Sequence, residues 1–224
     1  MTIRTGAQFM AGLRDDREVW YDGERVRDVT TFEPFAASVR SLALLYDMQH
    51  DPQHRDILTV DCPEFGERIA RPFEIPRTPE QLRLKREAYR LWAEATCGMM
   101  GRSPDFLNVM MASLAAKRSF FAEFSAERAD AMVGYYRHVA KNDLFLTHAL
   151  LDPQLDKGKL RHQQDDPTIT LHVKARTPEG LVVHGAKRIA TAAPYADELL
   201  VWPFPPTFQP GEEPYANVFA VPMN

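Results

Sequence analysis

This chain has little cysteine, no long apolar run and no excess of basic residues. Its two cysteines, Cys62 and Cys97, lie far apart and match no metal-ligand spacing, so each is expected to be a buried or unused thiol. No apolar run approaches the ~18 residues that a membrane-spanning helix needs. The 27 Lys and Arg against 31 Asp and Glu give a net charge of -4, which argues against a nucleic-acid-binding face. The sequence therefore predicts no metal site, no membrane contact and no nucleic-acid partner.

Targeting signals and phosphate-binding loops are also missing. Residues 1–20 contain no apolar signal core and carry acidic residues early, which favours a cytoplasmic protein. No internal repeat, low-complexity tract or Gly-rich phosphate loop is present. What remains is ordinary for a globular protein, since 45% of the 224 residues are hydrophobic and 26% are charged, enough for one large domain or two small ones.

The hydrophobic pattern changes once along the chain. From about residue 5 to 141 it is mostly that of helices, and from 144 onward it is mostly that of strands. One β exception is expected early, where "VWYDGERVRDV" predicts a hairpin that turns at Asp22-Gly23. We therefore expect an α+β protein, with a helical N-terminal domain at 1–141 and a β domain at 142–224.

Three helices in the first part have readable starts. Thr78 is expected to cap one of them, with Gln81 as the reciprocal partner of a capping box. Ser103 and Ser125 are expected to cap the next two. The helix at 104–124 carries a stripe of Met, Leu and Phe that predicts a core face. The apolar face expected for the helix after Thr78 consists of Leu82, Leu84, Tyr89, Leu91, Trp92 and Ala95.

The second part reads as adjacent hairpins. The turn "PEG" joins two alternating stretches, and adjacent hairpins with polar faces suggest a barrel or a sandwich. The last strand continues to Asn224, so we expect the chain to be the front part of a longer protein, cut inside its β domain. The expected strands lie at 144–151, 168–177, 181–191, 196–204 and 217–224.

The stretch "MMGRSPDFLN", residues 99–108, separates two helical patterns and places Arg102 at the joint. An arginine in such a turn most often points into water. The free N–H groups at the start of the next helix favour negative charge, however, so Arg102 could also bind an anion or a phenolate. On these residues alone, both interpretations stand.

Several motifs in one order make the chain similar to a known enzyme family. They are "TGAQFMAGLRDDREVWYDGERVRDVTTFEPF", "GRSPDFLN", "YYRHVAKNDLFLTHALLDPQLDK", "GLVVHGAKRIATAAPYADELLVWPF" and "FAVP". Together they resemble the large oxygenase component of two-component, FAD-dependent phenol hydroxylases, the 4-hydroxyphenylacetate 3-monooxygenase family. The resemblance covers nearly the whole chain.

The resemblance implies a fold like that of the acyl-CoA dehydrogenases. That fold has a helical N-terminal domain, a β-barrel middle domain and a C-terminal four-helix bundle. The helix-then-strand division fits the first two, and the bundle is absent from this chain. In the family the bundle completes the flavin site and the homotetramer, so the resemblance does not extend to activity or a tetramer for these 224 residues alone.

The resemblance also implies roles for particular residues. Arg102 corresponds to the family's substrate-binding arginine, and His148 corresponds to its active-site histidine. The FAD-lining positions implied in the same way are His148, Gln154, Leu155, Asp156, Lys157 and Thr191. Relatives commonly carry arginine at the position of Lys157, and lysine keeps the charge but loses the planar fork. Taken alone, His148 reads by default as a core or strand histidine.

Phe106 departs from the family pattern. Relatives usually have a tyrosine there, whose hydroxyl contacts the phenolic substrate. Phenylalanine keeps the ring and removes that hydrogen bond, so Phe106 is expected to line a substrate site that accepts a different or less polar phenol.

The implied activity is ortho-hydroxylation of a phenol in aromatic compound catabolism. In the family, reduced FAD is a diffusible co-substrate supplied by a separate NADH-dependent flavin reductase, and it reacts with O2 to a flavin hydroperoxide that hydroxylates the ring. A histidine can share the phenol proton, and a fixed guanidinium stabilises the phenolate. The resemblance leaves open which phenol is used, free or carrier-tethered, and whether it is hydroxylated or dehalogenated.

Two alternatives are of a different class. One is a truncated, non-catalytic remnant of the family. The other is a lyase like 4-hydroxybutyryl-CoA dehydratase, which shares the fold but uses an iron–sulfur cluster. Such a cluster requires several thiolates, and the chain has two cysteines in total, which weakens this alternative.

Overall fold

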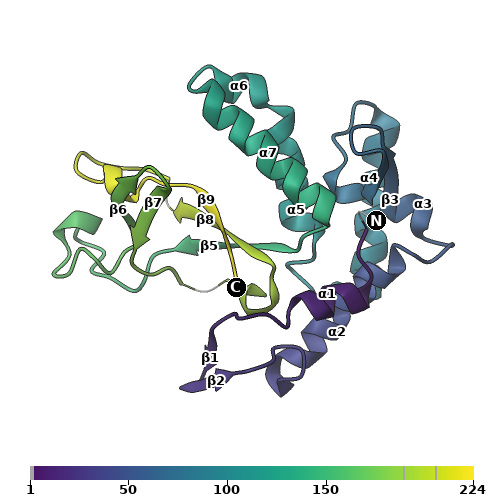
Figure 1. Ribbon diagram of the computed structural model, residues 1–224, viewed down its shortest axis with the longest axis horizontal. Helices are drawn as coiled ribbons and strands as arrows, with labels where there is room; N and C mark the ends of the chain where they lie inside the picture. The colour runs from purple at the N-terminus through teal and green to yellow at the C-terminus, as the bar shows by residue number, and fades with distance from the viewer. Residues whose placement is uncertain (1–2, 189, 205) are drawn as a thin grey trace. The chain divides into compact units, whose positions relative to one another are not determined.

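The computed structural model describes residues 3–188, 190–204 and 206–224. The chain separates into two compact units, the first ending at Leu146 and the second running from Thr147 to Met223. Helices make up most of the first unit and short strands most of the second (Figure 1). The structure is therefore a mixture of helices and sheets, and the assignment of 1–141 and 142–224 as domains stays a prediction.

The helices and strands occur in the following order. In the first unit they are α1 (Gly6–Gly12), β1 (Val19–Tyr21), β2 (Glu24–Val26), α2 (Glu33–Met48), α3 (Arg55–Leu58), β3 (Thr59–Cys62), β4 (Glu67–Ala70), η1 (Arg71–Phe73), α4 (Pro79–Ala95), α5 (Asp105–Ala116), α6 (Arg118–Ala122) and α7 (Ala126–Asn142). After them come β5 (Leu146–Leu151), η2 (Arg161–Gln163), β6 (His172–Thr177), β7 (Gly180–His184), η3 (Ala193–Tyr195), β8 (Glu198–Phe204), η4 (Glu213–Tyr215) and β9 (Phe219–Pro222).

The α1–α2 pair is packed closely because a glycine lies at the contact. A Cβ built on Gly6 would lie 2.4 Å from the carbonyl oxygen of Ala43, so no larger residue fits without a shift of the backbone. The Gly6 N–H donates to the Asp47 carboxylate at 2.7 Å, and the rings of Phe9 and Tyr46 stack with their centres 4.9 Å apart. These contacts form the core between the two helices.

The expected caps of α4 and α7 are confirmed. The Thr78 hydroxyl accepts the Gln81 N–H, and the Gln81 side chain accepts the Thr78 N–H. The Ser125 hydroxyl accepts the Arg128 N–H. Both caps satisfy N–H groups that the first turn of a helix leaves unpaired.

The early hairpin is also confirmed, but it is not the one β exception among the helices. Asp22 and Gly23, with φ of 50° and 80°, turn β1 into β2. A second antiparallel hairpin, β3–β4, pairs Thr59 with Ala70 and Cys62 with Glu67. Its strands have four residues each, too short for their alternation to be recognised in the sequence.

The stretch at 104–124 is two helices instead of one, and its expected core face is confirmed in α5, where Leu107 and Met111 are buried, but not in α6. The helix ends at Ala116, where Lys117 leaves the helical conformation, and the short helix α6 follows. Phe120 and Phe124 of this segment are 53% and 79% exposed. Figure 1 shows α6 and α7 as a helical hairpin, and the Arg118 guanidinium pairs with Asp130 across it at 2.6 Å.

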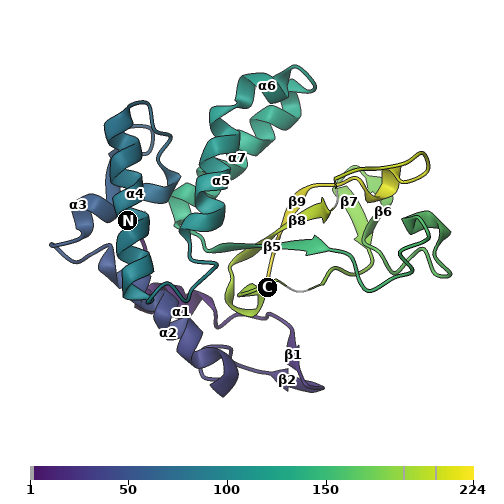
Figure 2. The same cartoon turned by 180° about the vertical axis from the view of Figure 1, so that it is seen from behind.

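The strands after Asp143 form two small sheets. One is three-stranded with the order β5-β8-β9, so β8 lies between β5 and β9 (Figure 2). The other is the antiparallel hairpin β6–β7, in which Pro178 and Glu179 of the expected "PEG" turn connect the paired residues Thr177 and Gly180. Among the strands of the described ranges, neither sheet closes into a barrel.

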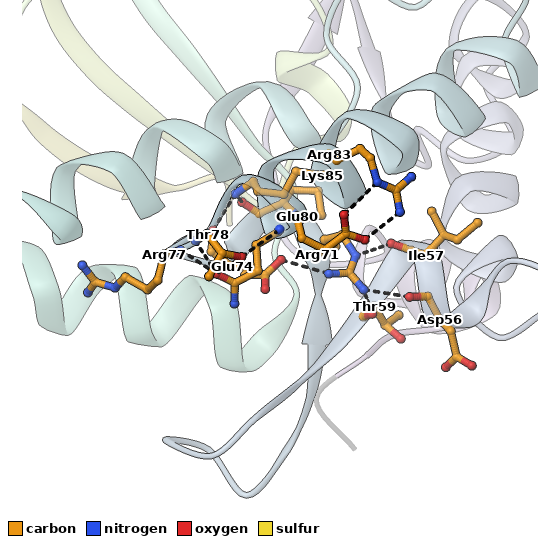
Figure 3. Close-up of polar contacts among 12 residues, drawn as sticks. Asp56, Ile57, Thr59, Arg71, Glu74, Arg77, Thr78, Glu80, Arg83 and Lys85 are labelled. Carbon is orange, nitrogen blue, oxygen red and sulfur yellow. Dashed lines mark hydrogen bonds and ion pairs between the residues drawn. The ribbon is translucent and has the colours of Figure 1, made fainter.

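Arg71 is a buried cation that joins α3, β3 and η1. Its Nη1 donates to the Glu74 carboxylate at 3.0 Å, and its other nitrogen atoms donate to the backbone carbonyls of Asp56, Ile57 and Thr59 (Figure 3). Arg71 and Glu74 are 4% and 8% exposed. A buried ion pair with its remaining donors satisfied in this way is costly to break.

Lys85 is a second buried cation, and it lies on the inner face of α4. Its Nζ donates to the carbonyl oxygens of Pro72 at 2.9 Å and Glu74 at 2.5 Å. Burial lowers the pKa of Lys85 to about 8, although the Glu74 carboxylate acts in the opposite direction. Together with Ala88 and Trp92 it forms the buried stripe of α4, whereas Leu82 of the expected apolar face is 58% exposed.

The described helices include none with the length and apolar character that crossing a membrane requires.

Candidate functional site

Arg102 lies in the turn between α4 and α5. Its guanidinium carbon is 4.5 Å from the centre of the Phe106 ring, and its Nη1 donates to the Gly101 carbonyl at 2.7 Å. A guanidinium over an aromatic face is attracted by the ring quadrupole. Arg102 is therefore held against Phe106 in the first turn of α5.

The start of α5 differs from the expected cap. Pro104, not Ser103, is the N-cap residue, and it makes no side-chain cap. The Ser103 hydroxyl donates instead to the Asp105 carboxylate at 2.5 Å, and the Ser103 carbonyl accepts the Phe106 N–H at 3.1 Å. With its hydroxyl committed to a carboxylate in the first turn, Ser103 leaves the helix N–H groups to other acceptors.

Buried polar groups at this helix start were not predicted from the sequence. Burial raises the pKa of Asp105 above its ordinary value, and the hydrogen bond from Ser103 offsets part of the rise. Burial, with the negative charge of Asp105 as the next cause, also raises the pKa of Tyr89. Asn108 is fully buried, and its side-chain amide has no hydrogen-bond partner among the described residues. The spacing of Asp105 and Asn108 by three on one helix is the signal that could have identified them.

His148 lies in the middle of β5 and is half-buried. The preceding residue, Thr147, is fully buried, and its hydroxyl donates to the Thr191 carbonyl at 2.8 Å. This bond joins residues that are 44 positions apart. The structure thus brings the strand of His148 beside the segment of Thr191.

Residues 154–157 form an irregular loop that follows β5. Gln154, Asp156 and Lys157 are exposed, and Leu155 is half-buried. The side chain of Gln164 fixes the loop, because its Oε1 accepts the Asp156 N–H at 3.3 Å and its Nε2 donates to the Asp156 carbonyl at 2.9 Å. The loop has a defined backbone and an accessible cation.

A buried ionic cluster connects this loop with the segment that leads to Thr191. We define the Asp152 cluster as Asp152, Arg161, Lys187 and Glu212. One carboxylate oxygen of Asp152 accepts Arg161 Nε at 2.8 Å and the other accepts Lys187 Nζ at 2.6 Å. Arg161 Nη1 also lies 3.2 Å from Glu212 Oε1. Long-range pairing of this kind has no sequence signal, and it was not predicted.

Glu212 receives donors from several parts of the second unit. Burial by itself raises the pKa of Glu212, but hydrogen bonds from the N–H groups of Gln209 and Arg161 and the charge of Arg161 outweigh it and lower the pKa. The side chains of the Asp152 cluster are 3–16% exposed. The cluster therefore pairs two acidic with two basic side chains in a largely enclosed place.

The predicted site residues fall into two groups. Arg102 and Phe106 are in contact in the first unit. His148, residues 154–157 and Thr191 belong to the second unit, where hydrogen bonds and ion pairs connect the segments that carry them. Within the described ranges, no group of three or more His, Cys, Asp or Glu side chains could hold a metal ion.

Comparison with known proteins gives consistent matches. The model of the family described as "4-hydroxyphenylacetate 3-hydroxylase N terminal" matches residues 5–224. The 4-hydroxyphenylacetate 3-monooxygenase oxygenase component of Thermus thermophilus is 44% identical over 99% of this chain and 44% of its own length. The chain thus spans less than half the length of this relative.

Solved structures also match nearly the whole chain. The oxygenase component of 4-hydroxyphenylacetate 3-monooxygenase complexed with FAD and 4-hydroxyphenylacetate matches 98% of this chain and 45% of its own, with a TM-score of 0.89 and 42% identity. An oxygen-tolerant archaeal 4-hydroxybutyryl-CoA dehydratase from N. maritimus matches 99% of the chain and 44% of its own, with a TM-score of 0.84. At 22% identity, the second likeness concerns the fold alone.

Proposed function

We propose, because this chain belongs to the 4-hydroxyphenylacetate 3-hydroxylase family, that it supplies the phenol-binding and flavin-binding residues of a monooxygenase that uses reduced FAD and O2. The observation that carries the proposal is Arg102 held against Phe106 at the start of α5, in the motif "GRSPDF". A relative of known structure binds FAD and 4-hydroxyphenylacetate, which supports the same classes of ligand here.

Arg102 binds the oxygen of the phenol in this proposal. A guanidinium beside a phenol favours the phenolate, and the phenolate has the higher electron density at the ortho carbon that is hydroxylated. The contact with Phe106 limits the rotation of the guanidinium, so less freedom is lost when the phenol binds. Phe106 itself presents an apolar ring to the substrate, which favours phenols with an apolar or small substituent.

His148 accepts the phenol proton in this proposal. An imidazole titrates near neutral pH and can take a proton and return it in one cycle. The Thr147 hydroxyl donates to the Thr191 carbonyl and so ties β5 to a second segment directly beside His148, which limits the movement of the strand that carries the imidazole.

The residues of the second unit fit a flavin by the chemistry of their donors. Lys157 provides an exposed cation for a phosphate, and Gln154 and Thr191 provide hydrogen-bonding groups suited to the carbonyl and imide edges of the ring. His148 completes this set. When bound, reduced FAD supplies the electrons that activate O2 for insertion of one oxygen atom into the ring.

The finer architecture and the partners belong to the same proposal. The two units correspond to the helical and β-barrel domains of an acyl-CoA-dehydrogenase-like fold, in an enzyme that assembles as a homotetramer. A separate NADH-dependent reductase delivers the reduced FAD, which places both components in the cytoplasm, where NADH is available. The chain spans 44–45% of the relatives' lengths, and the remaining length of those relatives is where the tetramer contacts and the rest of the flavin site are proposed to lie.

A substrate panel tests the proposal. Purified protein, an NADH-dependent flavin reductase, FAD and a set of 4-substituted phenols are incubated in air, and the products are identified by mass spectrometry. We expect a gain of one oxygen atom that derives from ¹⁸O-labelled O2. Loss of halogen from a chlorophenol in the same panel would instead identify a dehalogenating member.

The control reaction omits the phenol. Reduced flavin should then be consumed with release of hydrogen peroxide and no organic product. If a protein that also carries the remaining length of the relatives adds oxygen to no phenol in the panel, while flavin oxidation proceeds at the rate without protein, the proposed activity is wrong.

A further inference from the structure

The Asp152 cluster connects the two segments that are proposed to line the flavin. Asp152 follows β5 directly and precedes Gln154 by two positions, and Lys187 precedes Thr191 by four. Lys187 Nζ donates to the Leu150 carbonyl at 3.1 Å as well as to Asp152. Lys187 therefore binds both the last part of β5 and the residue that follows it.

Two further hydrogen bonds connect the same two segments. The Arg188 N–H donates to the Leu151 carbonyl at 2.8 Å, and the Thr147 hydroxyl donates to the Thr191 carbonyl. With the Lys187–Asp152 pair, these two bonds make three contacts that connect β5 and Asp152 to Lys187, Arg188 and Thr191. Within this arrangement, Asp152 is the residue whose two oxygen atoms each bind a different cation.

Burial makes the geometry of this connection specific. The side chains of Arg161, Lys187 and Asp152 are 11%, 10% and 16% exposed. Removing one partner of such a group leaves an uncompensated buried charge, whereas a surface pair is replaced by water at little cost. The backbone near Asp152 therefore has one favourable arrangement.

We infer that the Asp152 cluster is a positioning device for reduced FAD: Asp152, held by Arg161 and Lys187, sets the relative position of the loop 154–157 and the segment of Thr191. Asp152 acts through these segments and touches no reacting atom. The inference rests on the proposed function for the identity of the ligand, but the connection itself is a property of the second unit. A small displacement of a binding group costs up to about 100-fold in a preorganised site, which sets the scale of the effect.

The first experiment measures the connection without any flavin. Amide hydrogen exchange is compared between the wild type, Asp152→Ala and Asp165→Asn, because Asp165 forms an exposed ion pair with Lys159 in the same unit. We expect the Arg188 amide to exchange at least about tenfold faster in Asp152→Ala and to be unchanged in Asp165→Asn. The amides of β8 and β9 serve as the internal reference for global stability.

The second experiment measures the affinity for reduced FAD anaerobically by flavin fluorescence. Lys187→Met should weaken binding roughly tenfold, and Lys187→Arg, which keeps the cation, should restore most of the affinity. The phenol KM should change less than the flavin affinity, because Arg102 and Phe106, which hold the phenol in the proposal, lie in the first unit, whereas the cluster lies in the second. A purely structural role would lower the unfolding temperature of Lys187→Met without changing the flavin affinity of the folded protein.

The two possible failures are distinguishable. If the wild type, tested together with the remaining length that its relatives have, binds no reduced FAD, the proposed function is wrong, whatever the exchange rates show. If the wild type binds reduced FAD, and Asp152→Ala exchanges Arg188 at the wild-type rate or Lys187→Met binds FAD equally well, the positioning role is overturned alone.

Discussion

At the scale of single residues, a variant of Arg102 tests whether the turn between α4 and α5 binds the phenol or only connects two helices. Arg102→Lys keeps the positive charge but removes the planar guanidinium that lies over the Phe106 ring. We expect flavin oxidation to continue while product formed per reduced flavin falls by ~100-fold, because one preorganised donor is lost at the phenol oxygen. Arg118→Lys, at an exposed ion pair on α6, is the matched control. Equal coupling in the Arg102 and Arg118 variants would return Arg102 to the role of a helix-joint residue.

Variants of Phe106 test the contribution of its ring to the position of Arg102. Phe106→Leu removes the aromatic face at nearly constant volume, so the guanidinium of Arg102 gains freedom, and we expect coupling to fall by up to about tenfold. Phe106→Tyr keeps the ring and adds a hydroxyl, so coupling should be retained or improved with small 4-substituted phenols. The measurement is product per reduced flavin, with Phe124→Leu as an exposed-ring control. A Leu variant as well coupled as the wild type would remove the ring contact from the explanation.

Lys85 should give the protein a measurable pH dependence of stability. Burial lowers its pKa to about 8 from the ordinary 10.5, so between these values the unfolded chain binds more protons than the folded one. Stability from this group therefore rises with pH in that window, by up to ~1.4 kcal/mol per pH unit. Burial raises the pKa of Tyr89 and Tyr136, whose contributions fall as the pH rises above their ordinary value of 10.0, so measurements should stop near pH ~9.5.

Urea unfolding of the wild type and Lys85→Met at several pH values between 7.5 and 9.5 checks this expectation. The variant should be less stable by ~2 kcal/mol, because the carbonyls of Pro72 and Glu74 lose their donor, and its stability should rise less steeply with pH. Lys117→Met, at an exposed lysine, should keep the wild-type slope. Parallel slopes for the wild type and Lys85→Met would show that Lys85 titrates normally.

At the scale of elements, local signals were predictable and tertiary ones were not. Thr78 and Gln81 form a capping box within four consecutive residues, and Asp22-Gly23 forms a turn from two, so both were predicted correctly. The buried face of α4 contains Lys85 because carbonyls of η1 lie opposite it, which no helical periodicity encodes. Ser103 is a local exception: it was misassigned because its hydroxyl donates to the Asp105 side chain two positions later instead of accepting an N–H.

The residues of the candidate site also differ in whether the sequence could identify them. Arg102, His148 and Thr191 were identified by motif resemblance, because the motifs are contiguous in the sequence. The Asp152 cluster was missed, because its members come from four separate segments and are ordinary charged residues until the fold brings them together. Their roles in binding stay predictions.

The end of α7 depends on one left-handed residue. Asp143 has φ 47° and ψ 48°, is 2% exposed, and accepts hydrogen bonds from Gln49 and the Arg4 N–H on its carboxylate. Asp143→Ala should cost ~3 kcal/mol, from the strain of positive φ and the loss of those acceptors, whereas Asp143→Asn should cost ~1 kcal/mol because asparagine tolerates the conformation and keeps one acceptor. Denaturant unfolding measures both. Equal losses would assign the whole effect to the carboxylate charge.

At the scale of the whole molecule, the β6–β7 hairpin exposes apolar side chains to the solvent. Its side chains are mostly exposed, including Leu181 at 45%, Val182 at 43% and Val183 at 36%. Among the described strands, β6 and β7 pair only with each other, so each has one edge that no other described strand covers. Exposed apolar residues beside free strand edges are the usual origin of edge-to-edge association.

We therefore expect the purified 224-residue chain to self-associate through this hairpin. Light scattering after size exclusion should show a mass that rises with protein concentration without a plateau, unlike the fixed mass of a closed tetramer. Val182→Lys should return the chain toward a monomer, because a buried lysine at a strand–strand contact is disfavoured while the β6–β7 ladder is untouched. Val218→Lys removes a valine that is 58% exposed but outside the strands, and it should change the association little. A chain that is monomeric at every concentration, or two lysine variants that behave alike, would mean that the hairpin edge does not drive association, and the exposed valines would then be surface residues without a role in assembly.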